Sequence, residues 1–151
     1  MPSNLELRAT LNELIQSCRD SHEGFLTAAE NIEAGDVKNL LNHCSLERAK
    51  FAGELQAASH ELGDSTPEYA GSAVGALHRG WINLKTAIMG RSAHGILVEC
   101  ERGEDRAGAE YQKILQRKLP ANIREIVERQ YSAIQATHHR LKAMRDAEAP
   151  K

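Results

Sequence analysis

Apolar residues recur at every third or fourth position between Leu97 and Ile114, which is the spacing of one face of an α-helix. A glutamate, Glu104, stands in the middle of this face, where a core residue is expected. Because burial of an unpaired charge is costly, a buried Glu104 needs a partner: a proton, a cation, hydrogen-bond donors or a metal ion. The alternative is that Glu104 lies at the edge of the face and reaches water.

The composition narrows the classes of function. The 151 residues are enough for a single domain with a real core, which we expect to span residues 1–151. Lys and Arg number 19 against 21 Asp and Glu, and no basic block occurs, so we expect no nucleic-acid partner. The sequence contains neither a membrane-length apolar run nor a signal-sequence pattern, and we therefore expect a cytoplasmic protein with no membrane partner.

The three cysteines each lie on an apolar helical face. They are Cys18, Cys44 and Cys100. An odd number of cysteines at core positions predicts buried, reduced thiols rather than a framework of disulfides.

Capping residues and glycines mark the first two long helices. Ser3 and Glu6 form a capping box at the start of the first helix, and Gly35 is expected to end it. Asp36 is the expected cap of the second helix, which ends at Gly63. The link between the two helices is short, so they should pack antiparallel.

The second half of the chain holds one shorter and two long helices. A loop is expected over residues 63–71, followed by a shorter helix over about 72–89. Ser92 is the expected cap of the next helix, over about 93–118, and Asn122 that of the last helix.

The short helix decides the topology. We expect an all-helical, ferritin-like four-helix bundle in which a helical crossover makes the third long helix parallel to the second, and Trp81 anchors that crossover. The alternative is an up-and-down array of five helices. Four glycines inside the expected helices, Gly24, Gly53, Gly103 and Gly108, should allow close approach of neighbouring elements.

This topology brings polar residues of all four long helices to one height. The turn between the first two helices sets His22 level with Glu47, and the parallel third helix sets Glu47 level with Glu104. The last turn sets Glu104 level with a position close to His138. Glu23 lies within the uncertainty of one helical turn, roughly 5 Å.

Such a cluster resembles the ligand plan of di-iron carboxylate bundles, in which two helices each give a Glu and two give Glu-x-x-His. Here Glu47 is followed three positions later by Lys50, and His138 is preceded three positions earlier by Gln135. A complete dinuclear centre is therefore not expected.

Two interpretations of the cluster remain open. In the favoured one it is a structural polar network without a cofactor, in which His138 is charged or donates to Glu104, and Glu47 pairs with Arg48 or His22. In the alternative, a degenerate or mononuclear site binds Fe, Mn or Zn. The metal ligands would then be His22, Glu23, Glu47, Glu104 and His138.

Several motifs carry a family resemblance. They are Asp20 with Gly24-Phe25, Arg48 with Phe51-Ala52-Gly53-Glu54-Leu55, Gly75-Ala76-Leu77-His78-Arg79-Gly80-Trp81 with Lys85, Glu99-Cys100-Glu101-Arg102-Gly103-Glu104-Asp105 with Tyr111, and Gln130-Tyr131 followed by His138. Together they resemble the bacterial four-helix-bundle proteins of unknown function in the ferritin-like class, over nearly the whole chain. The resemblance implies a ferritin-like bundle and supplies no reaction.

The sequence favours a non-enzymatic structural or interaction protein whose partner is another copy of the chain or another protein. A metal-binding bundle with iron and oxygen chemistry is the alternative. No Cys-x-x-Cys, nucleophile elbow or Gly-rich phosphate loop is present in the sequence. Arg79 is an expected partner for Glu54, and with Lys85 it could hold an anion.

Overall fold

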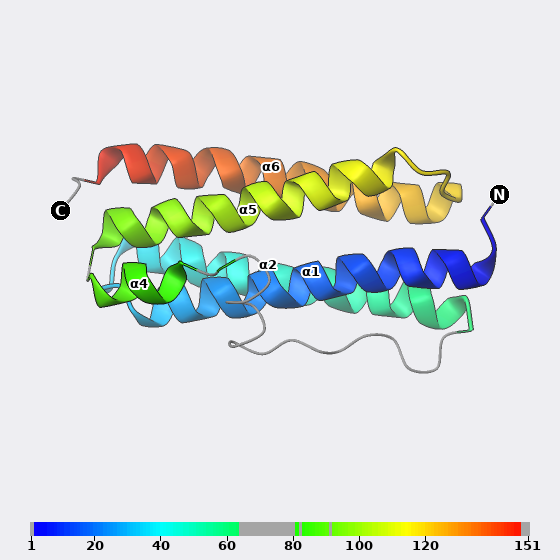
Figure 1. Cartoon of the computed structure of the whole chain (residues 1–151), viewed down its shortest axis with the longest axis horizontal. Coiled ribbons are helices and arrows are strands. Elements are labelled where there is room, and N and C mark those ends of the chain that lie inside the picture. The colour runs from blue at the N-terminus through cyan, green and yellow to red at the C-terminus, as the bar shows by residue number, and fades with distance from the viewer. Residues whose placement is uncertain (1, 64–80, 82, 91, 149–151) are drawn as a thin grey trace.

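The described residues form a bundle of four long helices with one short helix between the second and the third (Figure 1). The computed structural model describes residues 2–63, 81, 83–90 and 92–148. The helices are α1 (Asn4–Glu30), α2 (Asp36–Glu61), α4 (Leu84–Met89), α5 (Ala93–Leu115) and α6 (Ala121–Ala147).

The long helices form two antiparallel pairs, α1 with α2 and α5 with α6 (Figure 1). Both α2 and α5 begin at the end of the bundle where α1 ends, so that α2 and α5 run in the same direction (Figure 1). This arrangement confirms the predicted crossover and excludes the array of five up-and-down helices. Of the helix expected over 72–89, only α4 is helical among the described residues, since Trp81 and Asn83 precede it; residues 72–80, with His78 and Arg79, and residue 82 lie outside the described residues.

Two predicted helix caps are confirmed. The hydroxyl of Ser3 accepts a hydrogen bond from the backbone N–H of Glu6 at 3.2 Å, which closes the first turn of α1. The hydroxyl of Ser92 does the same for Gly95 at 3.1 Å, at the start of α5. Both contacts satisfy backbone donors that a helix start otherwise leaves open.

The other two predicted caps, Asp36 and Asn122, are wrong by one or two residues. The capping positions are Gly35 and Pro120, whose side chains have no acceptor. Gly35 has a φ of 148°, a conformation that favours glycine, and it turns the chain directly into α2. Asp36 is then the first helical residue, where its charge still favours the positive end of the helix.

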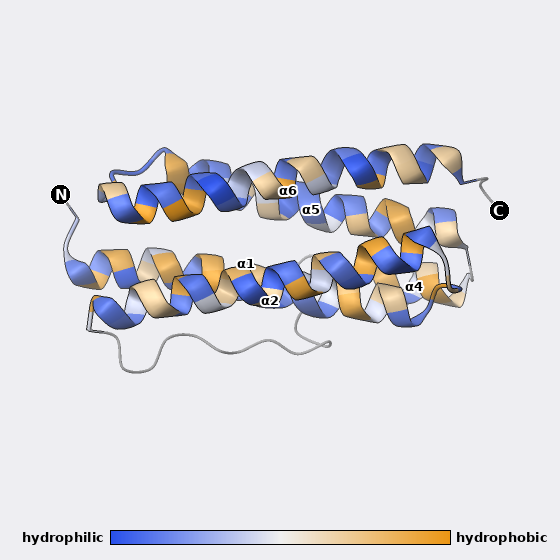
Figure 2. Cartoon of the chain, turned by 180° about the vertical axis from the view of Figure 1, so that it is seen from behind, coloured by the Kyte–Doolittle hydropathy of each residue, from blue (hydrophilic) through white to orange (hydrophobic). Residues whose placement is uncertain are grey.

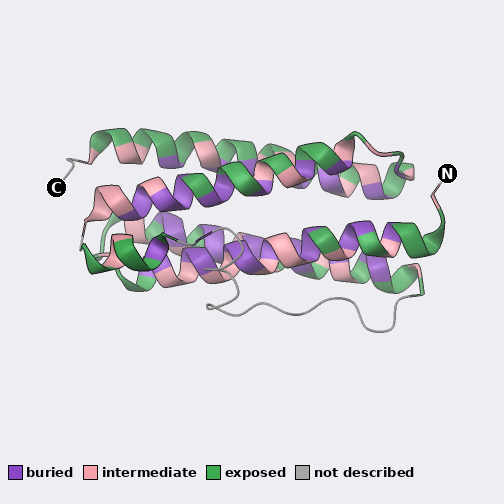
Figure 3. Ribbon diagram, viewed as in Figure 1, coloured by how far each residue is buried: buried purple, intermediate pink, exposed green. Residues whose placement is uncertain are grey.

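Each long helix turns an apolar face inward, and these faces hold most of the buried residues (Figures 2 and 3). The core consists of two clusters, which we call the Tyr111 half and the Trp81 half. The Tyr111 half includes Leu11, Leu14, Cys18, Phe51, Leu55, Tyr111, Ile123 and Ile134. The Trp81 half includes Phe25, Leu41, Cys44, Trp81, Leu84, Leu97, Cys100 and Leu141.

Trp81 is the anchor of the crossover, as predicted. Its side chain is 2% exposed and packs edge-on against Phe25, with ring centroids 5.0 Å apart. The indole lies against Gly24 of α1 and Gly103 of α5, where an added methyl group would clash with ring carbons. Gly24 and Gly103 therefore allow the predicted close approach, whereas the Cα of Gly53 faces open space.

Among the helices of the described residues, none has the length and apolarity that crossing a membrane requires.

Candidate functional site: a buried ion pair

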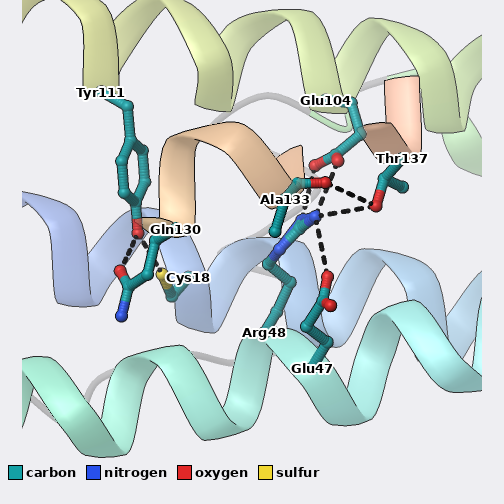
Figure 4. Close-up of polar contacts among 8 residues, drawn as sticks. All are labelled: Cys18, Glu47, Arg48, Glu104, Tyr111, Gln130, Ala133 and Thr137. Carbon is teal, nitrogen blue, oxygen red and sulfur yellow. Dashed lines mark hydrogen bonds and ion pairs between the residues drawn. The ribbon is translucent and has the colours of Figure 1, made fainter. Parts of the chain in front are cut away.

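The partner of Glu104 is Arg48, which lies on α2 directly across the core (Figure 4). The two terminal guanidinium nitrogens of Arg48 donate to the two carboxylate oxygens of Glu104 at 2.7 and 2.8 Å. Arg48 is 0% exposed and Glu104 is 1% exposed. This is the bidentate geometry in which an arginine and a carboxylate bind most strongly.

Other groups complete the surroundings of the Arg48 guanidinium. It lies 5.7 Å from the centre of the Phe25 ring and 5.5 Å from that of Phe51, so that one aromatic ring from each half of the core contacts the cation. One of its nitrogens also lies 3.4 Å from a carboxylate oxygen of Glu47 and 3.4 Å from the hydroxyl of Thr137. The Arg48 Nε is buried, and no hydrogen-bond acceptor meets it among the described residues.

Burial and pairing act in opposite directions on the two charges. Burial raises the pKa of Glu104 above the usual carboxyl range, and the guanidinium of Arg48 offsets part of that rise. Burial is the largest single influence on Arg48 and lowers its pKa, but the acidic groups around it, Glu104 first among them, together outweigh burial, and the net pKa of Arg48 lies above its ordinary value. Arg48 is therefore the fixed cation that allows a carboxylate to lie in the core.

Of the other predicted site residues, Glu47 shares the partner of Glu104, whereas His22 has a contact of its own. The Nδ1 of His22 lies 2.9 Å from the hydroxyl and 2.9 Å from the carbonyl of Ser45 on α2. Glu47 pairs with Arg48, which is one of the two partners that the sequence predicted for it. Glu23 is half-buried on α1.

His138 pairs with one exposed and one buried carboxylate of α5 rather than with Glu104. Its Nε2 lies 2.7 Å from Asp105 and 3.4 Å from Glu101. Arg145 also binds Glu101, so this side of the α5–α6 interface carries a partly exposed ionic network. The predicted contact from His138 to Glu104 is therefore wrong, because the ring faces Asp105 and Glu101 of α5, and Thr137 is the residue of α6 that contacts Arg48 at that height.

The five predicted metal ligands do not form one site in this arrangement. Both oxygens of Glu104 are bonded to a cation of the chain itself, and the Nδ1 of His22 is bonded to Ser45. Within the described part of the chain, no three His, Cys, Asp or Glu side chains are grouped so that they could hold a metal ion. A site for Fe, Mn or Zn built from these five residues stays a prediction that metal analysis can test.

A second polar contact crosses the Tyr111 half of the core, and the sequence did not predict it (Figure 4). The hydroxyl of Tyr111 donates to the Gln130 side-chain oxygen at 2.7 Å, and the sulfur of Cys18 lies 3.0 Å from the same hydroxyl. Tyr111 has a single hydroxyl proton, so the thiol of Cys18 is the donor in the second contact. The Gln130 amide donates in turn to the Phe51 carbonyl at 3.3 Å.

Burial makes the thiols of the core inert at neutral pH. It raises the pKa of Cys18 to about 12 and that of Cys44 to about 12, and it raises the pKa of Cys100 well above its ordinary value. All three cysteines are free and buried, which confirms the prediction from their positions.

Fold and site together define an all-helical bundle with a closed ionic centre and a crossover anchored by one tryptophan. The chain matches the model of a family described as a domain of unknown function, DUF2383, over residues 6–117. The match covers more than half of the 151 residues, so the protein belongs to this family. None of the curated proteins matches the chain.

Proposed function

We propose that the protein is a non-enzymatic structural or interaction module whose inner polar residues fix the packing of the bundle. The observation that supports this most strongly is the closure of the ion pair. Arg48 and Glu104 are buried and bind each other through both carboxylate oxygens, whereas an acid–base group must come within hydrogen-bond reach of a substrate. Contacts with other molecules then fall to the surface, where the partner is a second copy of the chain or another protein.

The pair is suited to specify how α2 and α5 align. The two helices are parallel, and a shift of one turn would leave both charges of Arg48 and Glu104 unpaired in the core. An apolar core tolerates such a shift more easily, because one apolar side chain can replace another. The pair thus favours one register over its neighbours, which is the best-supported role of a buried polar group.

Replacement of Glu104 by glutamine distinguishes this proposal from a reactive site. Glu104→Gln keeps the shape and removes the charge, so Arg48 is left unpaired and the free energy of unfolding should fall by about 3–5 kcal/mol. If Glu104 were instead kept for catalysis at a cost in stability, Glu104→Gln would raise the free energy of unfolding. Glu47→Gln is the matched control, because the side chain of Glu47 is 25% exposed and its loss should change stability by less than about 1 kcal/mol.

Elemental analysis addresses the metal alternative separately. The protein is made without an affinity tag, offered Fe, Mn or Zn with and without oxygen, and dialysed. The proposal expects only traces of metal. One equivalent per chain that is absent from both Glu104→Ala and His138→Ala would overturn it in favour of a metal protein.

A further inference from the structure

A cavity of about 1180 Å³ opens at the end of the bundle where α1 turns into α2. Its walls come from the α1–α2 turn, the first residues of α5, the end of α4 and Glu148 just after α6, which all lie at the same end in Figure 1. The volume exceeds the range of about 300–1,000 Å³ that is typical of pockets for small molecules. We call this cavity the end groove.

The floor of the end groove is apolar. It consists of Ile32, Val37, Ile88, Met89 and Ile96. Met89 is 73% exposed, which is unusual for a large apolar side chain, whereas Ile96 is buried. Exposed methionine is common at surfaces that adapt to apolar side chains of a partner, because its chain is flexible and polarizable. The floor therefore offers an apolar seat that the bundle itself does not cover.

The rim of the end groove is acidic. It carries Glu30, Glu33, Asp36 and Glu148, and no described residue that lines the groove is a cation. The nearby Lys38 is committed to the end of α1, where its ammonium donates to the carbonyls of Ala29 and Ile32. Asp36 lies in the first turn of α2 and is partly neutralised by the helix end, so the three glutamates carry most of the available charge.

We propose that the end groove binds a basic, amphipathic peptide segment of a protein partner. An apolar side chain of the peptide would lie on the floor beside Met89, and Lys or Arg residues would face the carboxylates of the rim. A symmetric contact with a second copy is disfavoured, because it would place the same acidic rims against each other. The inference rests on the proposed role as an interaction module and names its partner.

A fluorescein-labelled helical peptide of leucine and lysine is a direct probe. We expect fluorescence anisotropy to show saturable binding to the wild-type protein, and none for the matched peptide of leucine and glutamate. Glu30→Gln/Glu33→Gln should weaken binding by about ten-fold, since two charges facing the peptide are lost. Met89→Gln should also weaken it several-fold, and that loss should persist at high salt, where charge effects are screened.

The control is Glu125→Gln/Glu128→Gln, which removes the same charge from exposed positions at the opposite end of the bundle. Equal weakening by both double variants would mean that the peptide binds to negative charge in general, and would overturn the proposal. So would an absence of saturable binding, or a wild-type dimer in sedimentation that Met89→Gln dissociates. The unfolding of Glu104→Gln does not depend on these results, so failure of the groove and failure of the structural proposal are distinguishable.

Discussion

The two halves of the core meet at the Arg48–Glu104 pair, and they are filled in different ways. The Tyr111 half is closed by side chains of the long helices and the α5–α6 turn. The Trp81 half also takes in Trp81 and Leu84 from the crossover and its short helix. Arg48 contacts a phenylalanine of each half, so the ion pair is the border at which the two halves join.

The difference shows two ways to complete a bundle of four helices. In the Tyr111 half, the helices approach closely enough that Cys18, Tyr111 and Gln130 bond across the core. In the Trp81 half, an indole is inserted between α1 and α5, and the space for it is made by Gly24 and Gly103. The neutral polar groups of the Tyr111 half are satisfied by single hydrogen bonds, whereas the buried charges of Arg48 and Glu104 need a bidentate contact.

The largest expected effect comes from breaking the ion pair between the two halves of the core. Arg48→Met leaves the Glu104 carboxylate in the core without its cation, and we expect a loss of about 3–5 kcal/mol in urea unfolding at mildly alkaline pH. The pKa of Glu104 in the native state then rises further above its unfolded value. A carboxyl group with a raised native pKa destabilises the folded state only at pH values where the unfolded state has lost the proton. The loss of stability in Arg48→Met should therefore shrink as the pH is lowered.

Two further variants make the test of the border specific. Arg48→Met/Glu104→Leu removes both charges and should recover most of the lost stability. Lys50→Met, on the exposed side of α2, should stay within about 0.5 kcal/mol of wild type. An Arg48→Met variant as stable as wild type would mean that Glu104 is protonated in the native state and needs no cation.

The next effect concerns the Trp81 half. Gly103→Ala places a methyl group 2.5 Å from two ring carbons of Trp81, so the indole must shift and we expect a loss of about 1–3 kcal/mol. Gly53→Ala is the control, since its methyl group would meet open space and should stabilise α2 by about 0.5–1 kcal/mol. Trp81 is the sole tryptophan, so its fluorescence reports directly on the shift. If Gly103→Ala and Gly53→Ala changed stability and fluorescence equally, the close contact between Trp81 and Gly103 would be contradicted.

Residue heights along the bundle could be predicted from the sequence, because turn positions and helix directions fix them. The predicted offset between levels on α2 and α5 was 57 residues, and the observed pair of Arg48 and Glu104 is 56 apart. The rotation of each helix about its own axis was harder to predict. Neighbouring positions 47 and 48 both fit a spacing of three and four, and arginine is usually assigned to water.

A longer window holds the signal that was missed. Leu41, Cys44, Arg48, Phe51 and Leu55 follow a strict alternation of three and four, and all five are buried. The arginine at the centre of this pattern is the complement of Glu104 at the centre of the α5 face. The crossover is different, because its anchor, Trp81, was predictable as a lone large apolar residue, whereas the glycine contacts that receive it depend on tertiary packing.

A smaller effect is expected from the neutral chain in the Tyr111 half. Tyr111→Phe removes the hydroxyl that binds both Gln130 and Cys18, and we expect a loss of about 1–2 kcal/mol because the Gln130 oxygen is left buried without this donor. Tyr131→Phe is a suitable control, since that hydroxyl accepts an exposed hydrogen bond from Gln135. If both variants lose the same amount, the buried chain contributes nothing beyond packing.

The smallest expected effect compares the two halves through their buried thiols at alkaline pH. Burial holds the pKa of Cys44 at about 12, whereas the unfolded chain releases this proton near the ordinary value of 9.0. The native state therefore keeps a proton that the unfolded state loses, and stability should fall as the pH rises above about 9. Between about pH 8 and about pH 9.5 one such thiol should contribute roughly 0.8 kcal/mol to the fall. Urea unfolding of Cys44→Ala should show a shallower decline by that amount, and so should Cys18→Ala in the other half, because both thiols have the same raised pKa. A shallower decline in Cys18→Ala alone would mean that the Trp81 half admits water to Cys44, and the two halves would then differ in solvent access as well as in the way they are filled.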